Sequence, residues 1–550
     1  MTPQPAERRT GRGRPPEGAV RIAAVDIGSN SIRQIVADVF PDGAIRVVDE
    51  MKAQPRLGTG VQDTGVLSAE AMDRAVDALG RMATLAKKLG AQQIEVVATS
   101  AVREADNGSL FLGRVRRATG LQARVIDGSE EARLSFRSVL AHFDLARGRT
   151  VTMDIGGGSL ELSASAGGVV DQLTSLPLGA LRLTERFLRG DRSPADVQRA
   201  VRQMRRHARE LLRSELSGSD WRGARVIGSG GTFTNLAGMY LSRKGVQTAQ
   251  NVHATVVPRA EVEHLLEMLA AMSPAERRDV PGLNPERADI ILAGLAVAAE
   301  VLARLEAREL EVSRYGIREG LLLEAARVAP TAATPGDARE RSVRELAERC
   351  HYDERHARQV RRLALQLFDR VGKRLGCTAE DRQTLADAAL LHDVGYHISY
   401  DGHHKHSYHL ILHAELLGVS PTEQVVVANV ARYHRGSRPK KKHANYGTLD
   451  STLRKRIKRL AAILRIADGF DRGHVGAVES LSVRTVRRGP GQALAISPAP
   501  ARPGESLRLE LWGAHRKCEL LSDLLDMPVE IVAPDGTIVS ADLEEAEAGA

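Results

Sequence analysis

The chain has 550 residues, of which 43% are hydrophobic and 27% charged, and its formal net charge is +9. This length is too great for one core and predicts three or four domains of a globular protein. Aromatic residues make up only 3%, which argues against a nucleic-acid surface built on base stacking. The positive charge favours anionic partners, but nucleic acid is disfavoured, because only the charge would support it.

Nothing in the sequence suggests export or membrane insertion. Residues 1–18 are rich in Pro, Arg and Gly and contain no apolar segment, so they are predicted to be a disordered tail and not a signal peptide. No stretch reaches the ~18 consecutive apolar residues of a membrane helix. Cys350, Cys377 and Cys518 lie far apart and form no paired motif, which suggests a reducing compartment. We therefore expect a cytoplasmic protein with no membrane partner.

From residue 19 onward, strand and helix patterns alternate, which predicts mixed α/β sheets. The first such unit, 19–145, has a helical pattern over 68–89 and strand patterns at 21–25, 31–39, 45–48, 94–98 and 123–126. The second unit, 146–329, has strand patterns at 150–153 and 224–227, a hairpin at Gly167-Gly168, and helices at 259–272 and 287–304. Two α/β lobes are therefore predicted.

The composition changes after the second unit. Residues 330–340 contain Pro, Thr, Ala and Gly and are predicted to be a linker. Residues 341–480 have a helical pattern almost throughout. Residues 481–550 are predicted to form a small α/β domain with one short helix and strands at 481–486, 493–496, 507–511 and 529–532.

Each of the two α/β units contains one copy of a loop suited to phosphate. The copies are Asp26-Ile27-Gly28-Ser29-Asn30-Ser31 and, 128 residues later, Asp154-Ile155-Gly156-Gly157-Gly158-Ser159. Glycine lets backbone N–H groups approach an anion closely. A carboxylate at the end of a strand can hold a hydrated metal ion or orient water. The repetition predicts a duplicated lobe with a phosphate between the two copies.

Three further segments in these units stand where a strand ends. Glu131 lies in Gly128–Arg133 and is suited either to general base catalysis or to stabilising a helix N-terminus. Arg103 follows the strand 94–98 and is either a bidentate phosphate clamp or a surface arginine. Gly228-Ser229-Gly230-Gly231-Thr232 is another glycine-rich turn between a strand and a helix.

Together these segments resemble the exopolyphosphatase/guanosine pentaphosphate phosphatase family, which belongs to the actin-like superfamily. The resemblance extends from about Arg21 to at least Asp471. It is carried by ordered motifs at residues 26–31, 98–103, 128–133, 154–161, 176–180, 228–232 and 314–320.

The resemblance implies an α/β fold of two ribonuclease-H-like lobes, with a cleft in which a terminal phosphoanhydride is hydrolysed with Mg²⁺ or Mn²⁺. It implies that Glu131 is the catalytic base, and that Asp154 and Glu161 support the metal ion and water. It also implies a homodimer. The phosphate-binding residues that it implies are Asp26, Ser29, Asn30, Ser31, Arg103, Gly156, Gly157, Gly158, Ser159, Gly230, Gly231 and Thr232.

The helical region contains a second constellation, because seven of the 17 histidines lie between His392 and His413. The order His356, His392-Asp393 and Asp468 resembles the HD phosphohydrolase superfamily. Imidazoles with carboxylates suit Mn²⁺, Fe²⁺, Zn²⁺ or Mg²⁺, so the resemblance implies a second divalent-metal site in an all-helical HD-type domain. The alternative is a degenerate domain with core histidines that serves as a wall for polyphosphate.

A run of basic residues follows these histidines. Such a run is either a solvated face or a track that binds successive phosphates of a polyanion without reading a sequence. The residues predicted to form a polyphosphate track are Arg435, Lys440, Lys441, Lys442, Arg454 and Lys455.

The leading hypothesis is an exopolyphosphatase that releases orthophosphate from the end of inorganic polyphosphate. The first alternative is hydrolysis of guanosine pentaphosphate (pppGpp) to the tetraphosphate (ppGpp). Two others are a kinase or ATPase of the actin-like superfamily, which would use Gly228–Thr232 for adenosine, and a non-catalytic sensor of polyphosphate or alarmone. The basic, helical C-terminal half favours the long polymer.

Overall fold

The computed structural model describes residues 15–539 except 191, 219, 247–251, 329–334, 415 and 417. Most of the predicted N-terminal tail, residues 1–14, lies outside the described residues. The chain divides into two units, the first comprising Met1–Tyr240 and Val252–Pro335 and the second Leu241–Asn251 and Gly336–Ala550. Each unit is described by itself.

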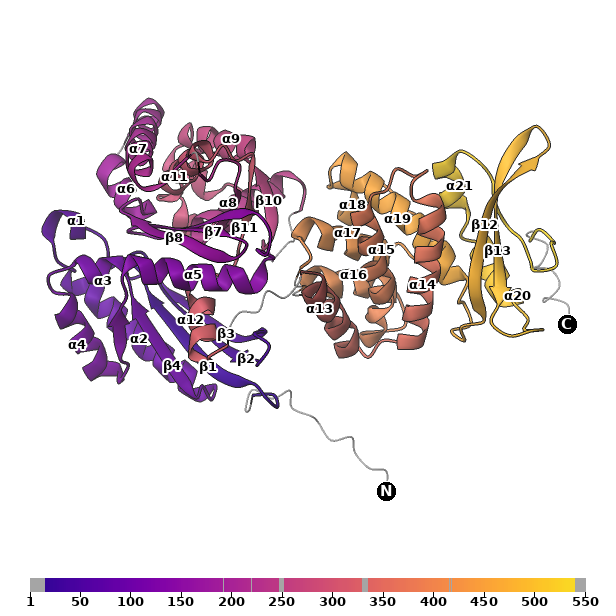
Figure 1. Cartoon of the computed structure of the whole chain (residues 1–550), viewed down its shortest axis with the longest axis horizontal. Helices are drawn as coiled ribbons and strands as arrows, with labels where there is room; N and C mark the ends of the chain where they lie inside the picture. The colour runs from indigo at the N-terminus through magenta and orange to yellow at the C-terminus, as the bar shows by residue number, and fades with distance from the viewer. Residues whose placement is uncertain are drawn as a thin grey trace, which may run out of the picture. The chain divides into compact units, whose positions relative to one another are not determined.

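The first lobe of the first unit is built on a five-stranded sheet with the order β3-β2-β1-β4-β5 (Figure 1). The central strand β1 runs antiparallel to β2 and parallel to β4. Because β1 is covered on both faces, its sequence is a nearly continuous apolar run. The strands are β1 (Val20–Ile27), β2 (Ile32–Val39), β3 (Ile45–Ala53), β4 (Gln93–Ala98) and β5 (Ala123–Val125).

Helices cover both faces of this sheet. Val25 and Ile27 of β1 pack toward Leu79 and Phe111 on one face, whereas Ile22 and Ala24 belong to the core on the other face. This alternation follows from the two-residue period of a strand. The helices are α1 (Val61–Thr64), α2 (Ala69–Lys88), α3 (Ser100–Glu104), α4 (Gly108–Thr119) and α5 (Gly128–His142), with α12 (Ile317–Ala325) added from a later part of the chain.

The second lobe repeats the first. Its six-stranded sheet has the order β10-β11-β9-β6-β7-β8. β6 takes the place of β1, with β7 antiparallel on one side and β9 parallel on the other. The strands are β6 (Arg149–Ile155), β7 (Leu160–Ala166), β8 (Val169–Leu176), β9 (Arg225–Ser229), β10 (Thr255–Pro258) and β11 (Glu309–Val312). This repetition confirms the predicted class of two ribonuclease-H-like lobes.

The helices of the second lobe include α11, which is apolar on nearly all sides because it is buried almost throughout its length. They are α6 (Ala180–Phe187), α7 (Pro194–Glu215), α8 (Gly231–Arg243), α9 (Arg259–Ala270), α10 (Pro274–Arg278) and α11 (Ile291–Arg304), with the 3₁₀ turn η1 (Pro285–Arg287).

Two helices connect the lobes. α5 belongs to the first lobe by sequence but packs against β7 and β8 of the second, and it lies between the two sheets in Figure 1. α12 follows β11 and returns to the first lobe, where Leu321, Leu322 and Leu323 join the core beneath β1 and β2. The first lobe thus takes part of its core from the range predicted for the second.

The second unit begins with helices. They are α13 (Pro335–Arg349), α14 (Glu354–Val371), α15 (Ala379–Leu391), α16 (His403–His413), α17 (Pro421–Arg432), α18 (Ala444–Gly447) and α19 (Ser451–Gly469), with the 3₁₀ turn η2 (Val394–His397). α19 packs against α14, α15 and α17. The linker predicted over 330–340 is wrong from residue 335 onward, because α13 begins at Pro335. A proline is tolerated in the first turn of a helix, where its missing N–H has no partner to lose.

A small sheet with two short helices completes the second unit. It contains β12 (Val478–Arg488), β13 (Gly491–Pro500), β14 (Val529–Ile531), α20 (Arg508–His515) and α21 (Glu519–Leu525). The strand predicted over 507–511 is wrong, because these residues lead into α20. Leu511 and Ala514 are buried while Leu509 is 48% exposed, a helical spacing that the alternation of leucines concealed. None of the described helices is both long and apolar enough to cross a membrane.

Candidate active site

The two glycine-rich loops line one pocket between the lobes of the first unit. Both loops close in the same way after their strand ends. The Gly28 N–H donates to the Ser31 carbonyl at 3.1 Å, and the Gly156 N–H donates to the Ser159 carbonyl at 3.0 Å. The duplication predicted from sequence is therefore a duplication of backbone geometry, with the two copies meeting at a shared pocket.

The second loop lies against the first with no room for a side chain. A Cβ on Gly157 would stand 2.9 Å from Ser29 Cβ, and a Cβ on Gly158 would stand 2.1 Å from Ser100 Oγ. Both distances are shorter than atoms allow without a shift. Glycine is thus required at these positions by close approach and not by an unusual backbone angle.

A helix fixes the second loop from behind. The N–H groups of Ala180 and Leu181, in the first turn of α6, donate to the carbonyls of Gly156 and Gly157 at 3.0 Å each. The Arg182 Nε donates to the Gly158 carbonyl at 2.6 Å. These contacts hold the loop carbonyls away from the pocket and leave its opposite side for an anion.

We expect Gly158→Ala to damage both stability and activity. The new methyl group would have to displace Ser100, so the free energy of unfolding should fall by ~1–3 kcal/mol and kcat/KM should fall at least tenfold. The matched control is Gly113→Ala in α4, where a Cβ meets nothing within 4 Å and a gain of about 0.5–1 kcal/mol is expected. Thermal melts and phosphate release check both variants. If both variants have the same stability and activity, the close contact at Gly158 does not require glycine.

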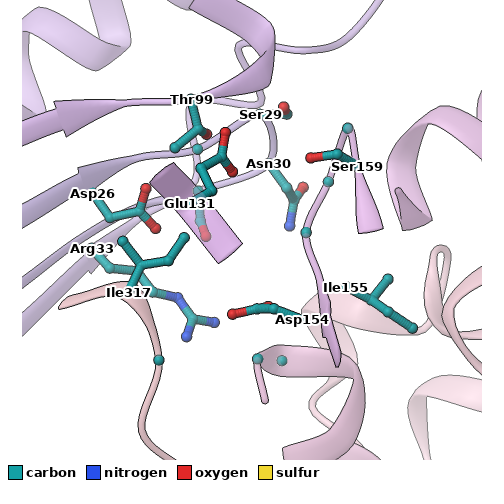
Figure 2. Close-up of a pocket in the computed structure, with 18 of the residues that line it drawn as sticks. Asp26, Ser29, Asn30, Arg33, Thr99, Glu131, Asp154, Ile155, Ser159 and Ile317 are labelled. Atoms are coloured by element: carbon teal, nitrogen blue, oxygen red, sulfur yellow. The ribbon is translucent and has the colours of Figure 1, made fainter. Parts of the chain in front are cut away.

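Strand register places a charged pair beside each loop. Asp26 lies opposite Arg33 across β1 and β2, and Asp154 lies opposite Glu161 across β6 and β7. Equivalent positions thus carry a guanidinium in the first lobe and a carboxylate in the second. Figure 2 shows the Arg33 guanidinium turned toward the Asp154 carboxylate. The two hairpins therefore contribute complementary charges to one pocket.

The two aspartates at the strand ends, Asp26 and Asp154, both have raised pKa values. Burial raises the pKa of Asp26 to about 6, although Arg33 and Arg318 oppose this shift. Burial also raises the pKa of Asp154, against a hydrogen bond from Ser135 Oγ to its Oδ2 at 2.9 Å. Buried carboxylates of this kind favour a cation beside them.

Glu131 enters the pocket from the first turn of α5 and is 3% exposed. The helix begins at this point because the Asp127 carboxylate accepts a hydrogen bond from the Glu130 N–H at 2.8 Å. The Arg103 Nη1 donates to Glu131 Oε1 at 2.5 Å and to the Ile126 carbonyl at 2.7 Å. Burial raises the pKa of Glu131 to about 7, although Arg103 opposes it.

Glu161 is also buried, and the Ser175 Oγ donates to its Oε1 at 3.0 Å. Burial raises the pKa of Glu161 well above its ordinary value, and the nearby Glu131 carboxylate adds to the shift. Two neighbouring buried carboxylates cannot both ionise at little cost. A divalent cation would remove this cost.

All but two of the residues predicted for this site line the pocket. The exceptions are Arg103, whose guanidinium is held on Glu131, and Thr232, which is buried beside Gly294. The catalytic, phosphate-binding and metal-binding roles of the set stay predictions. The lining members are Asp26, Ser29, Asn30, Ser31, Glu131, Asp154, Gly156, Gly157, Gly158, Ser159, Glu161, Gly230 and Gly231.

Sequence reasoning missed four arginines that line the same pocket: Arg33, Arg287, Arg314 and Arg318. The Arg287 guanidinium packs on the glycine turn of β9, 2.0 Å from where a Cβ on Gly231 would lie, and burial lowers its pKa to about 10. Arg314 and Arg318 lie in one of the motifs that carry the family resemblance, and Arg33 follows the first loop. The sequence therefore contained a signal for three of the four arginines. Arg287 has none.

The donors in the pocket fit a hydrated divalent cation. Asp26 Oδ1 and both amide atoms of Asn30 are buried with no hydrogen-bond partner among the described residues. They line the same pocket as Asp154 and Glu161. Carboxylate and amide oxygens with room for water suit Mg²⁺ or Mn²⁺.

The second unit brings the predicted HD-type residues together. His356 Nε2 and His392 Nε2 lie 3.2 Å apart, with Asp393 Oδ2 at 3.6 Å and Asp468 Oδ1 at 3.5 Å from His356. Two histidines outside the predicted set, His403 and His434, lie on the other side of Asp393.

The residues of the predicted polyphosphate track differ in their exposure to solvent. Lys440, Lys441, Lys442 and Lys455 are exposed. Arg435 and Arg454 are half-buried, and Arg454 Nη1 donates to the carbonyls of Gly447 and Leu449 at 3.1 and 2.6 Å. Arg454 is therefore used to hold its own loop, and the exposed lysines are the better candidates for a polyanion.

Two duplicated α/β lobes, with a glycine loop and a strand-end aspartate from each and a buried glutamate between them, define a two-lobed phosphohydrolase. Residues 35–328 match the Ppx/GppA phosphatase family, and residues 338–501 match domain III of that family. The chain therefore belongs to the Ppx/GppA phosphatase family and is a hydrolase of phosphoric anhydrides.

Named relatives have two different activities. A guanosine-5'-triphosphate,3'-diphosphate pyrophosphatase of Vibrio vulnificus is 29% identical over 448 residues, which cover 80% of this chain and 86% of the relative. The enzyme of the same name from Vibrio campbellii is 28% identical over 447 residues, with the same coverage of 80% and 86%. The solved structure of an exopolyphosphatase from Cytophaga hutchinsonii is 27% identical, with a TM-score of 0.51, and covers 56% of this chain and 99% of that one.

Proposed function

We propose that this chain is an exopolyphosphatase, which hydrolyses the terminal phosphoanhydride of inorganic polyphosphate and releases orthophosphate. The observation that carries the proposal is the lining of the pocket: two phosphate loops, four arginines and no aromatic ring among its described residues. A polymer end offers only phosphates, which arginines and backbone N–H groups bind well. A purine would gain affinity from stacking on an aromatic ring.

In the proposed reaction, the terminal phosphate lies between the two loops. The Glu131 carboxylate accepts a proton from water, the water oxygen adds to the terminal phosphorus, and the bond to the bridging oxygen breaks. Arg103 positions Glu131 through its 2.5 Å hydrogen bond. Asp154 and Glu161 would hold Mg²⁺ or Mn²⁺, which neutralises phosphate charge in such reactions. Arg33 and Arg287 supply the remaining positive charge.

Hydrolysis of pppGpp to ppGpp is the second candidate. The Vibrio relatives, named for a nucleotide substrate, align with 80% of this chain. Both substrates end in a phosphoanhydride, so the same pocket would serve either.

The substrate is tested by measuring kcat/KM with Mg²⁺ for long-chain polyphosphate and for pppGpp side by side. We expect the polymer to be preferred at least tenfold. The reverse preference would make the chain an alarmone phosphatase. If neither substrate is hydrolysed, the non-catalytic sensor is the hypothesis that remains.

The exposed lysines are proposed to bind the polymer away from its reacting end. We expect Lys441→Gln with Lys442→Gln to raise KM for long chains, leave pppGpp kinetics unchanged, and reduce the slope of log affinity against log salt by roughly one to two. The matched control is Lys87→Gln with Lys88→Gln, which removes two exposed lysines from α2. If log affinity has the same dependence on log salt in both double variants, the exposed lysines are only a solvated face and do not bind the polymer.

The pKa of Glu131 predicts an acid limb in the pH profile. A general base works only when it is deprotonated, so log(kcat/KM) should fall by about one per pH unit below the pKa of about 7. It should level off above that value. The profile is measured with polyphosphate between pH 5 and 9, under conditions in which substrate and Mg²⁺ do not change protonation state. A flat profile across pH 6–8 would argue against Glu131 as the base.

A further inference from the structure

The turn that carries Arg287 is too short to fix this side chain by itself. Arg287 is the last residue of η1, a single 3₁₀ turn of the second lobe, and it is buried where it lines the pocket. Such turns have poorer hydrogen-bond geometry than an α-helix. The position of the Arg287 guanidinium therefore depends on the groups around the turn.

Two carboxylates next to Arg287 in the sequence are paired with cations of the other lobe. Glu286 precedes Arg287, and its Oε2 accepts a hydrogen bond from Lys52 Nζ at 2.5 Å. Asp289 follows two residues after Arg287, and its Oδ2 lies 2.9 Å from Arg56 Nη2. Lys52 belongs to β3 of the first lobe, and Arg56 belongs to the segment that follows this strand. An ion pair between the lobes is thus present on each side of Arg287.

Arg56 also contacts the first phosphate loop through its backbone. Its N–H donates to the Asn30 carbonyl at 3.3 Å, and the Gly58 N–H donates to the Ser29 carbonyl at 2.8 Å. The φ angle of Arg56 is 53°, in the left-handed region, which a residue with a side chain keeps only where the surrounding structure requires it. Arg56 therefore joins a phosphate loop of the first lobe to the arginine-bearing turn of the second.

The segment around Arg56 is itself held in place. Arg74 Nη2 of α2 donates to the Pro55 carbonyl at 2.9 Å, and Leu57 is fully buried in the core of the first lobe. The Arg56 side chain thus extends from a fixed support. Its ion pair with Asp289 needs little further ordering of the backbone.

Arg287 lies among charges of both signs. Burial lowers the pKa of Arg287 to about 10, and the Arg33 guanidinium adds to this shift. Three carboxylates act in the opposite direction: that of Asp154, which lines the pocket, and those of Asp289 and Glu286, which do not. Which carboxylate the guanidinium approaches depends on how well each one is neutralised by other cations.

Asp289 is the stronger competitor for the Arg287 guanidinium. Its Oδ1 is buried and has no hydrogen-bond partner among the described residues. Its charge also acts on Arg277, but Arg277 donates to two backbone carbonyls at 3.3 Å each. The cation that neutralises Asp289 is therefore Arg56. Without Arg56, the Asp289 carboxylate would draw Arg287 away from the pocket.

We propose that Arg56, assisted by Lys52, is a positioning residue for hydrolysis: it neutralises Asp289 from the opposite lobe and so leaves the Arg287 guanidinium to the terminal phosphate. Lys52 neutralises Glu286 in the same way. The inference rests on the proposed reaction, in which Arg287 supplies positive charge at the phosphate. Neither Arg56 nor Lys52 lines the pocket, so both act through Arg287 and not on the substrate.

Arg56→Asn removes the guanidinium with little strain, because asparagine readily adopts the left-handed conformation. With long-chain polyphosphate and Mg²⁺, kcat should fall about fivefold in this variant and about tenfold when Lys52→Gln is added, since each exposed ion pair shifts an equilibrium by about that factor at most. KM should change little, because the rest of the polymer keeps its contacts. The matched control is Arg222→Gln, which removes an exposed ion pair with Glu306 within the second lobe and should change neither constant.

Two double variants separate action through Arg287 from a structural role. Arg287→Gln should lower kcat on the order of a hundredfold, and adding Arg56→Asn to it should change kcat by less than about twofold, because no guanidinium remains to be positioned. Adding Asp289→Asn to Arg56→Asn should restore kcat to within about twofold of wild type, because the competing carboxylate is gone. A loss of kcat in Arg56→Asn that is the same with and without Arg287, or that Asp289→Asn does not restore, would overturn the proposal.

The same variants are measured with pppGpp, which separates this inference from the choice of substrate. A wild-type chain that hydrolyses pppGpp and not the polymer would contradict the proposed substrate, and the fall and recovery of kcat with pppGpp would still support the role of Arg56. Normal kcat in Arg56→Asn with whichever substrate the wild-type chain hydrolyses would overturn the inference and leave the substrate assignment untouched.

Discussion

Replacing Glu131 by glutamine is expected to lower the rate of turnover strongly while leaving substrate binding nearly intact. The amide keeps the size of the side chain and an oxygen for the Arg103 hydrogen bond, but it cannot accept a proton from water. General base catalysis contributes ~10²–10⁴, so kcat should fall by that factor while KM changes only a few-fold. Initial rates of orthophosphate release, together with competition by a non-hydrolysed anion, separate the two effects.

The matched control for this variant is Glu130→Gln. Glu130 is the preceding residue of the same helix turn, but its carboxylate faces Arg124 and Arg133 outside the pocket. It should leave kcat unchanged within experimental error. A near-normal kcat in Glu131→Gln would show that Glu131 is not the general base.

Replacing Glu161 by glutamine is expected to lower activity and raise stability together. The buried carboxylate is costly when ionised, since burial and Glu131 raise its pKa well above the ordinary value. A raised carboxyl pKa means that the folded state loses stability as pH rises from the unfolded-state pKa. Without divalent metal, Glu161→Gln should therefore melt on the order of 2–4 °C higher at pH 8. The gain should vanish near pH 4.

The activity of Glu161→Gln should fall by at least a hundredfold and recover partly at high Mg²⁺, because the proposed metal site loses one of its ligands. Glu311→Gln in β11 is the contrasting control. Its carboxylate pairs with Arg225 at 2.5 Å, so its loss should lower the melting temperature and leave catalysis alone. A Glu161→Gln chain that melts lower than wild type at pH 8 would contradict the cost assigned to the buried charge.

The sequence predicts those parts of the fold and pocket whose residues follow one another directly in the chain. The loops after Asp26 and Asp154 are local: strand, carboxylate, glycines and hydroxyl follow one another, and the backbone repeats because the pattern repeats. The alternation of strands and helices likewise predicts two lobes, which the repeated strand order confirms.

What the sequence does not predict depends on packing between distant segments. Arg287 reaches Gly231 from a short 3₁₀ turn, and no local pattern marks it. In the histidine run of α16, only the fold decides that His403 is buried while His404 and His406 are half-buried and His409 is exposed. α20 forms where a strand was predicted, and its Gly513 packs closely on Gly469 of α19, a contact between distant segments that no local pattern shows.

The most direct test of the central claim is orthophosphate release from long-chain polyphosphate with Mg²⁺ in ¹⁸O-labelled water, followed together with chain length. The proposed mechanism predicts one labelled oxygen in each phosphate released, chains that shorten one unit at a time from an end, and a rate of release that is lower by ~10²–10⁴ in Glu131→Gln. Release at a near-normal rate in Glu131→Gln, or cleavage in the interior of the chain, would contradict it.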